Sequence, residues 1–108
     1  MTEEERFQEL QTLADTFAQA QAQAEYLEHF RKSKKALLMK DAEIGGATSA
    51  VIQEREAYRH SDYLMLLEGL KVATEVALSS KWRLELARMK FEAWRTRQAT
   101  KRAEMNLR

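Results

Sequence analysis

Residues 40–53 read KDAEIGGATSAVIQ, and this stretch decides how the chain folds. Gly45 and Gly46 can take the left-handed backbone conformation that closes the C-terminus of a helix. Thr48 or Ser49 can then supply the side-chain oxygen that caps the next helix. The stretch therefore predicts that one helix ends here and that another begins after a short turn.

The sequence before this turn predicts one long helix over residues 3–43. Thr2 and Glu5 have the spacing of a capping box, in which each side chain accepts a hydrogen bond from the other residue's backbone N–H. Apolar residues then recur every three to four positions, which is the spacing of one helix face. The row is Phe7, Leu10, Leu13 or Ala14, Phe17, Ala20 or Gln21, Ala24, Leu27, Phe30 or Arg31, Lys34, and Leu37 or Leu38, with polar interruptions near its end.

The sequence after the turn predicts a connector over residues 44–60 that contains a short helix. Ser61 is the predicted N-cap of a second long helix over residues 62–105, with Asp62 in its first turn. The apolar stripe of this helix consists of Tyr63, Leu66, Leu70, Ala73, Ala77, Leu84, Ala87, Phe91 and Trp94.

Composition supports an all-α fold in one domain over residues 1–108. The chain has no proline and only three glycines, and it is rich in residues that lose little side-chain freedom in a helix. The similar lengths of the long helices predict an antiparallel hairpin of coiled-coil type. Residues 1–30 carry seven acidic side chains and one basic one, whereas residues 81–108 carry three acidic and nine basic ones. Antiparallel packing would bring these two ends together.

A hairpin of two long helices leaves part of each helix without a neighbour. Apolar residues such as Leu64, Met65, Val72 and Met89 fall outside the main stripe and need cover. The cover could be the short middle helix, a second copy of the chain or a different protein. We expect a homodimer that forms a helical bundle.

The sequence contains few of the groups that catalysis requires. It has no cysteine, so disulfides and thiolate metal sites are excluded. His29 and His60 lie outside metal-binding spacings, and no phosphate loop or nucleophile motif is present. No run approaches the roughly 18 apolar residues of a membrane span. We expect a protein that is not an enzyme, has no cofactor and does not enter membranes.

Residues 30–40 read FRKSKKALLMK and contain five basic side chains. Arg31, Lys32 and Lys35 are candidates for contact with nucleic acid. The basic residues do not share one helix face, so a solvated exterior is the favoured interpretation. Lys34 interrupts the apolar row and is expected to pair with a carboxylate of a neighbouring helix.

A second basic segment, KWRLELARMKFEAWRTRQATKR, covers residues 81–102. Arginine and lysine attract the phosphate backbone, and exposed aromatic rings can stack on bases. Trp82, Arg97, Lys101 and Arg102 are therefore the leading candidates for nucleic-acid contact. Trp94 lies on the apolar stripe and is expected in the core.

Three blocks, YLEHFRKSKKALLMKDAE, AVIQEREAYRHSDYLMLLEGL and KWRLELARMKFEAWRTRQATKRAE, give the chain a resemblance over residues 25–104. It resembles a group of small uncharacterised bacteriophage proteins that are associated with phage recombination and replication genes. The resemblance implies a phage or prophage origin, action in the cytoplasm of the bacterial host, and an accessory role in handling DNA or a host protein. It implies no catalytic residue.

Two functions from different classes are therefore expected. In the first, the protein is a non-enzymatic accessory of phage DNA recombination or replication, and its basic C-terminal helix contacts single- or double-stranded DNA. In the second, it is a helical module that engages or inhibits a host or phage enzyme. The candidates for that partner interface are Leu38, Met39, Tyr63 and Met65.

Overall fold

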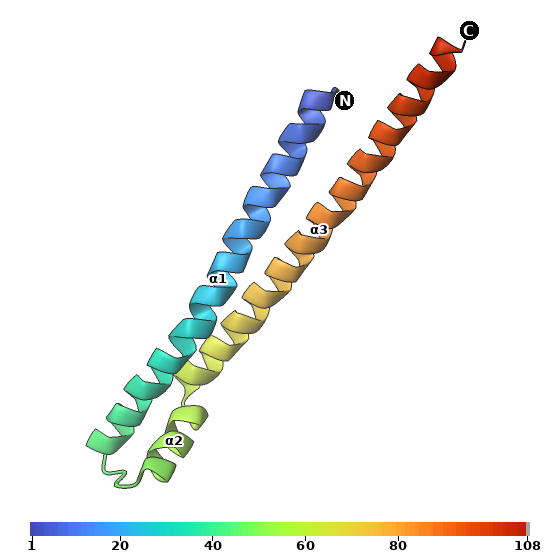
Figure 1. Cartoon of the computed structure of the whole chain (residues 1–108). Helices are drawn as coiled ribbons and strands as arrows, with labels where there is room; N and C mark the ends of the chain where they lie inside the picture. The colour runs from blue at the N-terminus through green and yellow to red at the C-terminus, as the bar shows by residue number, and fades with distance from the viewer. Residues whose placement is uncertain (108) are drawn as a thin grey trace. The chain divides into compact units, whose positions relative to one another are not determined.

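The computed structural model describes residues 1–107, which form three helices (Figure 1). Helix α1 spans Glu3–Ile44, α2 spans Ala50–Arg59 and α3 spans Ser61–Asn106. The fold is all-α, with two long antiparallel helices joined by a short one, as the sequence predicted. The predicted ends of the long helices lie within one residue of those observed.

The start of α1 is held by the predicted capping box. The Glu5 N–H donates to Thr2 Oγ1 at 3.1 Å, and the Thr2 N–H donates to Glu5 Oε2 at 3.4 Å. Two backbone donors that have no partner inside the helix are thereby satisfied.

The end of α1 is a glycine turn. The Ala47 N–H donates to the Ala42 carbonyl at 2.9 Å, and the Gly46 N–H donates to the Glu43 carbonyl at 3.1 Å. This pair of bonds forms a Schellman motif, and Gly46 takes its left-handed position with φ of 108°. The predicted role of the glycine pair therefore belongs to Gly46.

The junctions of α2 use one predicted cap and one unexpected cap. Ser49 accepts a hydrogen bond from the Ile52 N–H at 3.2 Å and is the N-cap of α2. The prediction of Ser61 as the N-cap of α3 is wrong by one residue. The N-cap is His60 instead. Its backbone carbonyl accepts a hydrogen bond from the Leu64 N–H at 3.1 Å, and its side-chain Nδ1 accepts one from the Asp62 N–H at 3.0 Å. An imidazole nitrogen thus takes the place of the expected hydroxyl.

Contacts divide the chain into two compact units. Unit 1 combines Met1–Ala18 with the part of α3 from Leu78 onward, and unit 2 is Gln19–Ala77. Within each unit, α1 and α3 run antiparallel (Figure 1). Unit 2 also contains α2 and both of its junctions.

Buried side chains on α1 and α3 follow a seven-residue repeat. On α3, Tyr63, Ala77 and Phe91 are buried fourteen residues apart, and the half-buried Leu70 and Leu84 lie midway between them. Repeats of seven are the signature of two helices packed with a slight left-handed twist. The row of each long helix that faces the other is called its seam, and on α3 it runs through these residues. On α1 the seam is half-buried except for the buried Leu38; it passes through Arg6 rather than Phe7, and through Arg31 of the predicted alternatives Phe30 and Arg31. Its members are Arg6, Leu10, Leu13, Phe17, Ala20, Ala24, Leu27, Arg31, Lys34 and Leu38.

The core of unit 2 forms where the three helices meet. Leu38 of α1, Ala57 of α2 and Tyr63 of α3 are 4%, 1% and 5% exposed. The rings of Tyr58 and Tyr63 meet edge to face with centroids 5.3 Å apart. The small side chain of Ala57 lets α2 approach the two long helices closely.

The core of unit 1 is aromatic. Phe91 is buried, and its ring lies 4.8 Å from that of Phe7 and 5.9 Å from that of Trp94. The Arg6 guanidinium lies over the Trp94 ring at 4.6 Å from its centroid. Trp94 is therefore part of the packed seam, as expected, and Arg6 covers its face.

We expect Leu38→Ala to lower the free energy of unfolding by about 2–5 kcal/mol, because it leaves a cavity between three helices. Leu37→Ala is the matched control, since Leu37 is exposed on the same helix turn and surface changes of this kind cost less than about 0.5 kcal/mol. Urea unfolding followed by circular dichroism at one protein concentration measures both. Equal costs for the two variants would contradict this core.

We expect Gly46→Ala to destabilise the protein by about 1–2 kcal/mol, because a Cβ atom is strained at positive φ. Gly45→Ala is the control. A Cβ at Gly45 would meet only the carbonyl oxygens of Ala42 and Asp41, at an ordinary 3.5 Å. Thermal unfolding of both variants checks the assignment, which fails if Gly45→Ala is the more damaging change.

Candidate nucleic-acid interface

Trp82 is an exposed aromatic residue on the side of α3 away from the seam. Its side chain is 61% exposed, and the nearby Lys81 ammonium lies 6.0 Å from the ring centroid. The structure therefore leaves this ring available to another molecule. Trp82 will contact a bound molecule only if that molecule covers the face of α3 opposite the seam.

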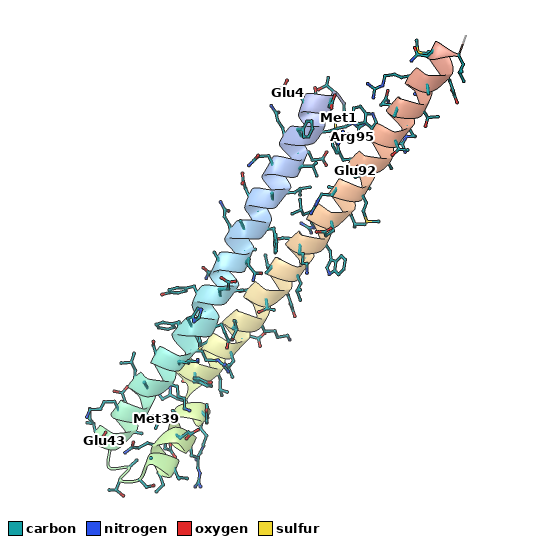
Figure 2. All side chains as sticks on the ribbon, viewed as in Figure 1. Met1, Glu4, Met39, Glu43, Glu92 and Arg95 are labelled. Atoms are coloured by element: carbon teal, nitrogen blue, oxygen red, sulfur yellow. The ribbon has the colours of Figure 1, made fainter. Side chains whose placement is uncertain are left out.

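Arg97, Lys101 and Arg102 are exposed near the end of α3. Figure 1 shows that the last turns of α3 continue past the first turn of α1 within unit 1. A polar hollow near this end is lined by Glu3 of α1 and by Glu92, Arg95, Thr96 and Arg102 of α3. Figure 2 shows Glu92 and Arg95 on α3 near this end of α1.

The basic side chains of this segment are largely unneutralised. Within residues 81–107, Arg88 is the only basic residue with an ion pair, to Glu85 at 3.5 Å along the same helix. Antiparallel packing does place the acidic and basic ends in one unit. Across the described residues, however, no carboxylate of the first turns of α1 forms an ion pair with α3. The positive charge is therefore directed to solvent.

The basic candidates of unit 2 are in a different situation, because two of the three have partners. Arg31 pairs with Glu28 at 2.6 Å, and this carboxylate raises the pKa of the guanidinium. Lys35 lies 3.2 Å from Glu54 of α2. Lys32 alone is exposed without an ion pair among the described residues. The structure thus groups Trp82 and the C-terminal cations in unit 1, and it gives Arg31 and Lys35 structural roles in unit 2.

Lys34 forms the predicted bond to a neighbouring helix. Its Nζ lies 3.7 Å from the Asp62 carboxylate in the first turn of α3. The pair joins the last part of α1 to the start of α3, where the carboxylate also lies close to the positive end of the helix dipole. Lys34 is therefore a packing residue.

Lys35 joins α1 to α2 through two partners. Its ammonium lies over the Tyr58 ring at 4.8 Å from the centroid and contacts the Glu54 carboxylate. Interaction with the Tyr58 side chain, and then with Glu54, raises the pKa of Lys35 above its ordinary value. Both contacts favour the charged form.

We expect Lys35→Met to be less stable than the parent protein at pH 7. Because the folded-state pKa is raised, the stabilisation is fully present below the ordinary lysine pKa of about 10.4 and is lost as pH rises through the folded-state value. The difference between variant and parent should therefore shrink in alkaline solution. Lys32→Met, at an exposed position without an ion pair, should show no such pH dependence in urea unfolding.

The four predicted partner-interface residues are divided by the structure. Leu38 and Tyr63 are core residues and are not available to a partner, because α2 folds over them. Met39 is partly buried against the same core, whereas Met65 is exposed. The sequence already carried a signal for this distinction, because Leu38 and Tyr63 lie on the apolar stripes of their helices.

Large apolar side chains remain exposed on all three helices, which indicates that another molecule covers part of this surface. The exposed residues of α1 and α2 include Leu37, Ile44, Val51 and Ile52. Those of α3 are Leu64, Met65, Val72, Val76, Leu78, Trp82, Leu86, Met89 and Met105.

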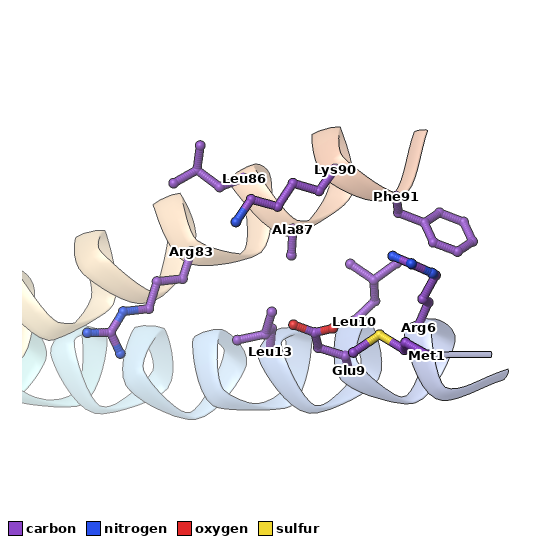
Figure 3. A pocket seen from close by; sticks show the side chains of 10 residues that line it. All are labelled: Met1, Arg6, Glu9, Leu10, Leu13, Arg83, Leu86, Ala87, Lys90 and Phe91. Carbon is purple, nitrogen blue, oxygen red and sulfur yellow. The ribbon is translucent and has the colours of Figure 1, made fainter. Parts of the chain in front are cut away.

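Unit 1 also contains an open hollow of about 390 Å³ between α1 and α3 (Figure 3). Its apolar floor includes Leu10, Leu13 and Ala87, and Arg83 and Lys90 also line it. The described residues provide no group of three metal-ligating side chains. Within residues 1–107, no helix has an apolar stretch long enough to cross a bilayer.

Comparisons with known protein families, with curated proteins and with solved structures give no significant match.

Proposed function

We propose that this protein is a non-enzymatic accessory of phage DNA recombination or replication that contacts DNA through the basic end of α3. The observation that carries the proposal is the pair of exposed cations at Lys101 and Arg102, which form no ion pair with any carboxylate in residues 1–107. Cations without intramolecular partners keep their full attraction for phosphate. The resemblance to phage proteins supports the same function and the cytoplasm of a bacterial host as its location.

The physics of such a contact is electrostatic. Each lysine or arginine that meets a phosphate releases condensed counterions, so affinity falls as salt concentration rises. The whole chain carries a net charge of only +1, which means that attraction must come from the local distribution of charge. A helix end with exposed cations on several sides can follow a phosphate backbone without reading bases.

We expect Lys101→Ala/Arg102→Ala to weaken DNA binding by at least about tenfold at low salt and to reduce the salt dependence of the affinity. Fluorescence anisotropy with labelled single- and double-stranded oligonucleotides measures this. The control is Arg55→Ala/Lys71→Ala, which removes the same charge from exposed positions of α2 and α3 in unit 2. Equal losses in both variants would remove the assignment of the site to the end of α3.

A second candidate function is a helical module that engages a host or phage enzyme. It is favoured by the exposed apolar side chains of unit 2, among them Val51 and Met65, at 68% and 72% exposure. Such a partner would be held by apolar burial and would tolerate salt. Absence of oligonucleotide binding at low salt, together with salt-tolerant capture of an identified phage or host enzyme that Met65→Glu abolishes, would replace the DNA proposal with this one.

We also propose that the protein acts as a homo-oligomer. Exposed apolar side chains on the helices support this assembly, since a monomer would leave them in water.

A further inference from the structure

α3 has a second apolar row in unit 1, which we call the outer stripe: Leu78, Trp82, Leu86 and Met89. These side chains are between 52% and 67% exposed. At about 100° per residue, they fall within an arc of about 80° that is centred about 170° from the seam. In Figure 3, Ala87 points toward α1, whereas Leu86 is turned away from α1 at the rim of the hollow that it helps to line. The packing of α1 therefore leaves most of the outer stripe uncovered.

The spacing of the outer stripe is that of a second helix contact. Trp82, Leu86, Met89 and Ala93 follow one another at intervals of four, three and four residues. Alternation of three and four is how a helix presents a row of side chains to a parallel or antiparallel partner helix. Trp82 provides a large aromatic side chain at the start of this row, the kind of residue that dominates binding energy in interfaces.

Charged residues border the outer stripe differently on its two sides. Glu85 and Glu92 lie along one edge, and Arg83, Lys90 and Arg97 lie along the other. Within its own helix Glu85 also pairs with Arg88, which lies farther round toward the seam. Each glutamate has a basic residue five positions later, at Lys90 and at Arg97. In a parallel pair of helices, a residue that flanks the apolar row on one helix meets the residue five positions later on the other helix. Glu85 would therefore meet Lys90, and Glu92 would meet Arg97.

This arrangement of charge determines which helix pairing is favourable. When two copies of α3 pack in parallel around a twofold axis, the acidic edge of each faces the basic edge of the other. When they pack antiparallel, acidic edges meet and basic edges meet, which is repulsive. The outer stripe is thus self-complementary in the parallel orientation.

We propose that a second copy of this chain docks on the outer stripe, with α3 packed in parallel against α3 and with Glu85 and Glu92 facing Lys90 and Arg97 of the partner subunit. Leu86 and Met89 lie in the centre of this contact and Trp82 lies beside them, so Trp82 is an interface residue and does not stack on bases. Each α1 stays on the far side of its own α3. On the proposed DNA function, parallel pairing also brings Lys101 and Arg102 of both copies to the same end.

The first test is the oligomeric state by sedimentation velocity at micromolar concentration. The parent chain is expected to be a dimer and Met89→Glu a monomer with unchanged helicity. Met105→Glu is the control, because Met105 is equally exposed on α3 but lies outside the outer stripe, and this variant should remain dimeric. A monomeric parent chain overturns the proposal, as does a Met89→Glu variant that stays dimeric.

Exchange of charge tests the edges. Glu85→Lys/Glu92→Lys makes both edges basic, and Lys90→Glu/Arg97→Glu makes both acidic, so each variant alone should dimerise at least about tenfold more weakly. Mixing the two should restore a dimer that contains one copy of each. Undiminished dimerisation of the separate variants would exclude the proposed pairing of edges.

A single cysteine tests the orientation, because the chain contains no other. In the parallel dimer the two copies of residue 89 face each other, so Met89→Cys should form an intermolecular disulfide rapidly under mild oxidation. Arg55→Cys, which lies on α2, is the control and should not. Dimers in which Met89→Cys stays reduced would overturn the parallel arrangement. DNA binding is not used in any of these measurements, so their outcome is independent of the proposed function.

Discussion

Each long helix can bury only the side chains that face the other, and this limit governs the rest of the structure. The buried rows on α1 and α3 repeat every seven residues, which keeps them in register as the two helices twist around each other. The glycine turn at Gly46 and the caps at Ser49 and His60 reverse the chain so that these rows meet. Everything on the opposite faces, including Trp82 and Met65, is left to solvent or to another molecule.

Local signals in the sequence were sufficient to predict most of the fold. The capping box at Thr2 and Glu5, the glycine turn and the helix ends all depend on residues close together in the chain. Lys34 was predicted to find a carboxylate because a charge inside an apolar row needs one, and Asp62 supplies it. His60 was missed as a cap because serine beside it is the stronger N-cap residue by statistics, and only the observed hydrogen bonds decide between them.

The candidate site was harder to predict, because exposure and ion pairing depend on distant residues. Lys35 was indistinguishable from Lys32 in sequence, yet its partner Glu54 lies nineteen positions away on another helix. Leu38 and Tyr63 were proposed as a partner surface and are instead core, because Ala57 of α2 packs on them. The partner of Arg31 was within reach of sequence analysis, since Glu28 lies three positions earlier on the same helix. Arg97, Lys101 and Arg102 were chosen as candidates because they lie in a basic segment interleaved with tryptophan, and the structure shows that they are exposed.

The side chains along the seam differ in size between its ends and its middle. Aromatic and leucine side chains fill the cores of both units, whereas five of the six seam residues near the division between units are small: Ala20, Ala24, Ala73, Ala77 and Ser80, beside Phe17. Small side chains bury little apolar area, so these central turns add little stability for each residue they order. Stabilising contacts are therefore concentrated in two places along each helix. Amide hydrogen exchange should show two separately protected groups of residues, each of which can unfold locally while the other stays folded.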